Sequence, residues 1–181
     1  MHVGDLAKAT EDAFSAWVAD RAAGLDAIML ALTRELVADL NRRARDHHLG
    51  GASPGQEVEL ANRSRANVGD VIITRSNDRR LRLSPTDWVK NGDRWTITHI
   101  GRYGDLDVRH NRSQLVVRLP ADYVHVSTGL GYATTIHGAQ GVSADTMHGL
   151  VSSSPSLTWV RKTISLPGRS GASRTSRTLN P

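Results

Sequence analysis

The chain has 181 residues, a net charge of +5 and no cysteine, which excludes disulfides and thiolate metal sites. Residues 152–181 contain five basic and no acidic residues, so they carry the whole excess, and residues 1–151 are electrically balanced. Basicity therefore says little about what residues 1–151 bind.

The sequence favours a soluble, cytoplasmic protein with no membrane partner. It contains no run of about 18 apolar residues, and its N-terminal residues do not resemble a signal peptide. Its eight histidines show no metal-ligand spacing such as H-E-x-x-H, so we expect no metal site.

Residues 1–52 are typical of an α/β fold. Helical spacing of apolar residues predicts a helix over 10–23, and the continuous apolar run at 26–32 predicts a buried strand. Thr33 is a suitable N-cap for a second helix, which Gly50 and Gly51 should end.

Residues 53–121 change to short alternating or β-branched segments about ten residues apart. Five strands are expected between 57 and 120, and Asn91-Gly92 should form a hairpin turn. This pattern predicts a small β-barrel or sandwich inserted into the α/β domain.

Residues 122–151 should return to the α/β domain, whereas 152–181 differ sharply in composition. The latter segment has eight serines, three prolines and scattered arginines, which predicts a disordered basic tail.

Two segments contain candidate ligand-binding residues. Thr135, His137 and Gln140 place three hydrogen-bonding side chains in a short loop beside two glycines, which allow close backbone approach to a ligand. The hairpin sequence of 74–83 is locally basic and could either follow a phosphate backbone or form a solvated strand edge. Its four arginines are Arg75, Arg79, Arg80 and Arg82.

The order of these segments resembles superfamily 1 DNA helicases, in the branch of RecD-like proteins and conjugative relaxase–helicases of the TraI/TrwC (MobF) type. "TTIHGAQGVSAD" resembles motif V, T-x-H-x-x-Q-G-x-T/S-x-D, and "IMLALTRELVADLNRRAR" resembles the motif IV region. Residues 68–101 resemble the inserted barrel of the Src-homology-3 (SH3) kind. The similarity covers about 10–151 and implies part of the second RecA-like domain, of the P-loop NTPase type.

The resemblance also implies roles for single residues. Thr135 and His137 match positions that contact the backbone of single-stranded DNA, and Gln140 lies between the two ligands. Thr33, Arg34, Gly141 and Ser143 match positions that face the ATP cleft. The barrel would guide or split the duplex, which gives the arginines of 75–82 a role. Many relatives carry Lys or Arg where this chain has Gly138.

ATP and Mg²⁺ are the cofactors of the intact family, but the chain lacks a P-loop G-K-[ST] sequence, a first RecA-like domain and motif VI. We therefore expect a fragment of a conjugative or mobile-element helicase with no catalytic residue or cofactor of its own, ending in a frameshifted or fused segment. Two alternatives stay open: a stand-alone nucleic-acid-binding module, and a subunit that completes a separately encoded helicase N-terminal half.

Overall fold

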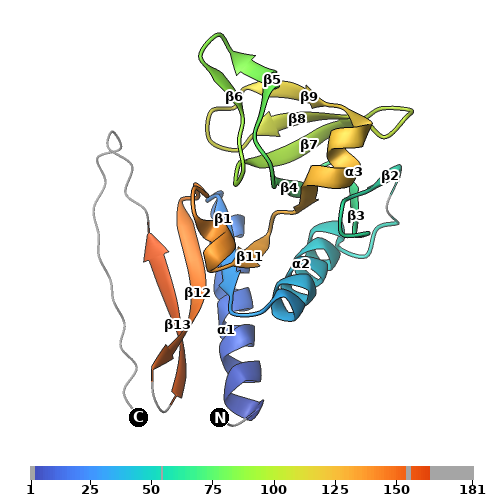
Figure 1. The fold of residues 1–181 in the computed structure, drawn as a ribbon. Coiled ribbons are helices and arrows are strands. Elements are labelled where there is room, and N and C mark those ends of the chain that lie inside the picture. The colour runs from blue at the N-terminus through green and yellow to red at the C-terminus, as the bar shows by residue number, and fades with distance from the viewer. Residues whose placement is uncertain (1–2, 54, 154–155, 164–181) are drawn as a thin grey trace.

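The computed structural model describes residues 3–53, 55–153 and 156–163 and has a mixed α/β fold (Figure 1). Three α-helices, one short 3-10 helix and thirteen strands are found in these residues. The helices are α1 (Val3–Ala22), α2 (Arg34–Leu49) and α3 (Ala121–Ser127). The strands are β1 (Ala27–Ala31), β2 (Glu57–Glu59), β3 (Arg65–Asn67), β4 (Val71–Thr74), β5 (Asp78–Ser84), β6 (Asp87–Val89), β7 (Arg94–Ile100), β8 (Leu106–His110), β9 (Val116–Leu119), β10 (Thr128–Leu130), β11 (Ala133–Thr135), β12 (Thr146–Ser153) and β13 (Ser156–Thr163).

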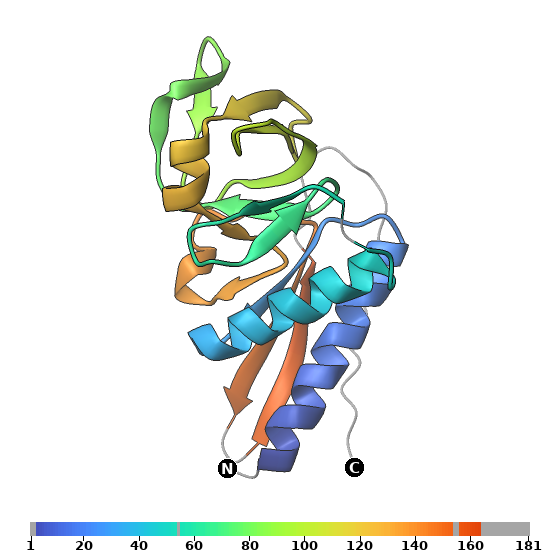
Figure 2. The ribbon, with the colours of Figure 1, turned by 90° about the vertical axis from the view of Figure 1, so that its right-hand side faces the viewer.

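The first sheet joins segments that are far apart in the sequence. Its order is β11-β1-β12-β13, with β1 parallel to both β11 and β12, and β13 antiparallel to β12. Helices α1 and α2 pack against each other on one face of this sheet (Figure 2). Trp17 of α1 donates to the carbonyl of Ala27, and Asn41 of α2 donates to the carbonyl of Ala133.

The buried strand and the capped helix that the sequence predicts are confirmed as β1 and α2. Both faces of β1 are covered, since Met29 packs among the helices while Ile28 packs against Ile73 of β4. Thr33 accepts a hydrogen bond from the Leu36 backbone N–H at 3.2 Å, and Gly50 ends α2 with a φ of 56°.

The second sheet is antiparallel, with the order β10-β4-β7-β8-β9, and two separate ribbons, β2–β3 and β5–β6, flank it. The five predicted strands are present, but they do not form the expected closed SH3-like barrel. Within the described residues β9 and β10 remain unpaired with each other, because α3 connects these two edge strands. Asn91-Gly92 does form a turn, but β6 and β7 on either side of it pair with different partners.

The return to the first sheet begins at Ala133 rather than at residue 122. The segment "YVHVS" lies in α3, and β10 still pairs with β4 of the second sheet.

A buried cation connects the two sheets. The side chain of Arg94, on β7, is only 1% exposed. It donates to Asp26 at 2.8 Å and to the carbonyls of Gly131 and Ala27, both at 3.0 Å.

The predicted disorder of 152–181 is wrong for the part that the structure describes. Residues 156–163 form β13, which pairs along β12. Arg161 of β13 forms a two-pronged ion pair with Asp20 of α1, which also contacts the buried His148 at 2.8 Å. The backbone pairing and this ion pair therefore hold β13 on the sheet. Residues 164–181 lie outside the described part.

No helix within the described ranges is long and apolar enough to cross a membrane.

Candidate functional site

A groove of about 830 Å³ lies where α2, the end of β11 and the edge of the second sheet meet. It contains residues from both sequence segments that were expected to bind a ligand. Its lining includes two arginines and one histidine but no acidic residue. The lining residues are Arg34, Val37, Ala38, Asn41, Ala61, Asn62, Arg75, Thr128, Gly129, Leu130, Thr134, Thr135, His137 and Gly138.

Arg75 comes directly after β4 and reaches across to β11. Its Nη1 donates to Thr134 Oγ1 at 3.2 Å, and its backbone N–H donates to the Ser127 carbonyl at 2.8 Å. Among the described residues no acidic side chain pairs with it. Partial loss of water lowers the pKa of the Arg75 guanidinium, yet an arginine in a protein stays charged at neutral pH. The groove therefore contains a positioned cation with unused hydrogen-bond donors.

The loop after β11 is a short 3-10 turn, His137–Ala139. Thr135 Oγ1 accepts a hydrogen bond from the Gly138 N–H at 3.0 Å, which leaves the exposed His137 beside the groove. A Cβ atom at Gly138 would lie 2.8 Å from Thr134 Oγ1 and 3.4 Å from Arg75 Nη1. Arg75 thus places its charge next to Gly138.

The other predicted DNA-binding residues do not line this groove. Gln140 is exposed and is not among the lining residues. Arg79, Arg80 and Arg82 lie on β5, in a hairpin that projects from the second sheet (Figure 1). Arg80 pairs with Asp78, Arg79 lies over the ring of Trp88, and Arg82 donates to the Pro85 carbonyl.

The four residues expected to face ATP do not form one pocket. Thr33 uses its hydroxyl to cap α2, and Arg34 lines the groove. Ser143 accepts a hydrogen bond from Arg112 at 3.2 Å, and Gly141 lies next to the Asn91 turn. The described residues also contain no cluster of acidic or histidine side chains suited to a metal ion. The residues present therefore do not fit ATP and Mg²⁺ by themselves.

The sequence reasoning missed Asn41, which holds the groove together. This buried amide accepts hydrogen bonds from the backbone N–H groups of Tyr132 and Ala133 and donates to the Ala133 carbonyl. In the sequence, Asn41 could have been recognised as a polar residue beside the apolar positions Leu40 and Ala44, which are buried in α2.

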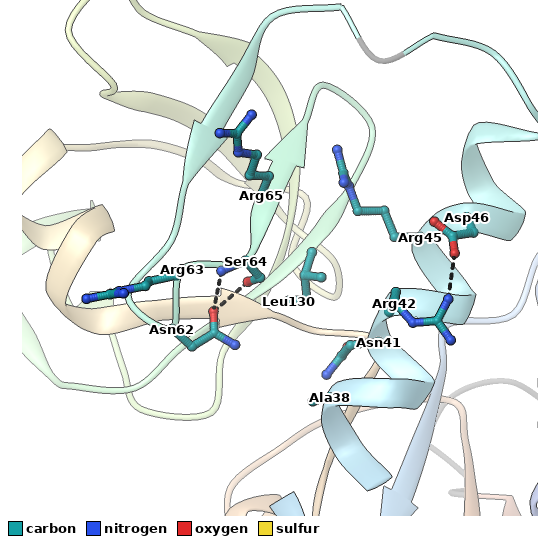
Figure 3. Close-up of a pocket in the computed structure, with 10 residues that line it drawn as sticks. All are labelled: Ala38, Asn41, Arg42, Arg45, Asp46, Asn62, Arg63, Ser64, Arg65 and Leu130. Carbon is teal, nitrogen blue, oxygen red and sulfur yellow. Dashed lines mark hydrogen bonds and ion pairs between the residues drawn. The ribbon is translucent and has the colours of Figure 1, made fainter. Parts of the chain in front are cut away.

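A second hollow of about 340 Å³ adjoins the groove and shares four of its lining residues: Ala38, Asn41, Asn62 and Leu130 (Figure 3). Its arginines differ from Arg75 because three of them have acidic partners. Arg42 pairs with Asp39 and Asp46, Arg45 with Glu57 and Asp70, and Arg65 with Glu57. The hydrogen bond from Arg45 is the main reason that the pKa of Glu57 is lowered.

No family model matches the chain. It is 29% identical over 107 residues to two uncharacterized proteins of Mycobacterium tuberculosis, MT2373 of strain CDC 1551 / Oshkosh and Rv2311 of strain ATCC 25618 / H37Rv. A crystal structure of Bacteroides Pif1 bound to ssDNA matches with a TM-score of 0.40 and 15% identity, over 66% of this chain and 33% of that chain. This structural likeness is too low to carry an argument about function. The matched part is 55% of this chain and 55% of each mycobacterial protein, so the chain spans about half the length of the curated relatives it matches.

Proposed function

We propose that the chain binds single-stranded nucleic acid, DNA in the first instance, through the groove between Arg34, Arg75 and His137. The observation that carries the proposal is the convergence of these residues. Arg34 follows β1, Arg75 follows β4 and His137 follows β11, yet all three line one groove that has no acidic lining residue.

The chemistry of the groove suits a phosphate backbone. Guanidinium groups, hydroxyls and backbone N–H groups are the donors that proteins use to contact phosphate oxygens. Arg75 offers the guanidinium and Thr135 offers a hydroxyl, whereas the Gly138 N–H is already bonded to Thr135 Oγ1. Such contacts position a strand without reading its sequence, so we expect little preference among bases.

The motif V and motif IV resemblances support a place for this chain in a helicase of the relaxase–helicase type, including conjugative or mobile-element transfer. ATP turnover in such an assembly requires a P-loop from a partner, because Lys8, Lys90 and Lys162 do not lie in a G-K-[ST] sequence. A separately encoded helicase N-terminal half is therefore the protein partner that we propose.

The proposal is tested by fluorescence anisotropy with a labelled oligothymidylate of about 12 nucleotides. We expect Arg75→Ala to weaken binding about 5- to 10-fold and to lower the slope of log affinity against log salt by about 0.7, because one phosphate contact is lost. His137→Ala should weaken binding by a smaller factor.

Arg109→Ala is the matched control, since Arg109 is exposed on β8 and does not line the groove. A variant lacking 164–181 measures the contribution of the basic C-terminal residues. Binding that disappears with 164–181 and ignores Arg75→Ala would contradict the groove as the site.

A further inference from the structure

Thr134, the middle residue of β11, lies beneath the surface of the groove. It is one of the lining residues, yet it is 0% exposed, so a strand in the groove does not reach its hydroxyl. Thr134 comes one position before the first residue of the motif V pattern, and the resemblance predicts no role for it. Its Oγ1 accepts a hydrogen bond from Arg75 Nη1 at 3.2 Å. Thr134 therefore contacts the cation of the groove rather than a ligand.

Arg75 is an exposed residue that depends on this contact for its orientation. An unanchored arginine samples many rotamers, and ordering its side chain on association costs conformational entropy. Within the described part of the chain, Thr134 Oγ1 is the only acceptor that the Arg75 guanidinium bonds. A guanidinium has five N–H donors, so the bond to Thr134 leaves the others for phosphate oxygens.

The missing side chain of Gly138 provides the space for this contact. A Cβ atom there would lie 2.8 Å from Thr134 Oγ1, 2.9 Å from Thr135 Oγ1 and 3.4 Å from Arg75 Nη1. The first two distances are too short for a carbon atom beside a hydroxyl oxygen, so a larger residue would displace the partners of the bond. Gly138 does not have a positive φ, so space rather than backbone conformation is the reason for glycine here.

We infer that Thr134 is a positioning residue for nucleic-acid binding: its buried hydroxyl orients the Arg75 guanidinium at the groove, and Gly138 leaves room for the contact. A strand then meets a cation that is already ordered. This inference rests on the proposed function, because Thr134 acts only through the phosphate contact that Arg75 makes.

The first test is Thr134→Val, which removes the hydroxyl and nearly keeps the shape of the side chain. Fluorescence anisotropy with a labelled oligothymidylate of about 12 nucleotides measures the affinity. We expect binding to weaken about 2- to 10-fold, because Arg75 must now be ordered on association. The salt slope should hardly change, since Arg75 stays charged, whereas Arg75→Ala lowers it by about 0.7. Thr134→Ser keeps the hydroxyl and should bind like the wild type.

A double-mutant cycle separates positioning from a general structural role. In the Arg75→Ala protein, Thr134→Val should cause no further loss of affinity, because the residue that it positions is gone. A purely structural role would weaken binding by the same factor in both backgrounds. Thr146→Val is the matched control, since Thr146 is equally buried on β12 of the same sheet but does not line the groove.

Gly138→Ala tests the same contact without changing Thr134. It should weaken binding by the wild type and have a smaller effect in the Arg75→Ala background. Gly149→Ala is the steric control, because the nearest atom to its added Cβ would be Leu30 Cβ at an ordinary 3.7 Å. Thermal melts show whether each variant is folded, so either substitution can test the inference if the other unfolds the protein.

The outcomes distinguish the two proposals. Unchanged affinity in Thr134→Val, an equal loss in both backgrounds, or the same loss in Thr134→Ser overturns the positioning role. The proposed function still stands in these cases if Arg75→Ala binds weakly with a lowered salt slope. Absence of binding by the wild type, or binding that ignores Arg75→Ala, overturns both.

Discussion

The two sheets contribute to the groove in different ways. The first sheet is mostly parallel, and its strands β1 and β11 end at the groove, where Arg34 and His137 follow them. The second sheet is antiparallel. It supplies Arg75, which directly follows β4, the strand that pairs with the edge strand β10. Neither sheet alone contains the site. The distance between its cations therefore depends on how firmly the two sheets are joined.

The largest effect is expected from Arg94→Met, which removes the buried cation between the sheets. The change leaves Asp26 and the carbonyls of Ala27 and Gly131 without their partner. We expect the free energy of unfolding to fall by about 3–5 kcal/mol, because uncompensated buried polar groups are costly. Urea unfolding measures this, and Arg109→Met on exposed β8 should change it by about 0.5 kcal/mol or less. A similar small change for Arg94→Met would show that the sheets are held by apolar packing instead.

A smaller loss of stability is expected from Thr33→Ala. This variant tests whether Thr33, between β1 and α2, has a structural or a ligand-binding role. Loss of the cap on the Leu36 N–H should cost about 1 kcal/mol of stability. Affinity for single-stranded DNA should stay unchanged, because the Thr33 hydroxyl already has its partner in α2. Thermal unfolding and anisotropy on the same variant check both parts, with Thr86→Ala in an exposed turn as the control. Weakened DNA binding at unchanged stability would assign Thr33 to the ligand.

The smallest effect is expected at acid pH, in the contact between α1 and the last strands of the first sheet. Burial lowers the pKa of His148 from its ordinary value of 6.5, although the nearby Asp20 favours the charged form and Arg161 opposes it. Below about pH 6.5 the unfolded chain therefore binds a proton at His148 more readily than the folded chain does. The contribution of neutral His148 to the free energy of unfolding is present above that pH and is lost as the pH falls.

Thermal melts at about pH 7.5 and about pH 5.5 measure the loss, which His148→Gln should reduce. His125→Gln, on the exposed face of α3, is the control and should leave the pH dependence as it is in the wild type. An unchanged pH dependence in His148→Gln would place the acid-sensitive group elsewhere.

Local rules were sufficient for elements whose cause lies within a few residues. The apolar run of β1, the Thr33 cap and the Gly50 stop each have a local physical reason, and all were predictable. The expected closed barrel failed because closure depends on which distant edges pair, and α3 takes the chain between them. The composition of 152–181 predicted disorder, but β13 is held by pairing with β12 and by Asp20, which is more than 130 residues away.

The candidate site likewise contains residues that the sequence could predict and residues that it could not. The loop of Thr135 and His137 was identifiable from its residue types, and Arg75 from its basic segment. Nothing in the sequence separated Arg75 from Arg79, Arg80 and Arg82, because only the path of the chain after β4 brings Arg75 alone to the groove. Asn41 was overlooked because its three partners are backbone groups about 90 residues away.

That one amide has a kinetic consequence. Asn41 ties α2, which lines the groove, to the backbone at Tyr132 and Ala133, between the lining residues Leu130 and Thr134. The position of α2 relative to this segment is therefore already set before any strand arrives, and a preorganised site loses little conformational entropy on association. Capture of a strand should then be limited by electrostatically steered encounter, which salt slows, and not by a rearrangement of the protein.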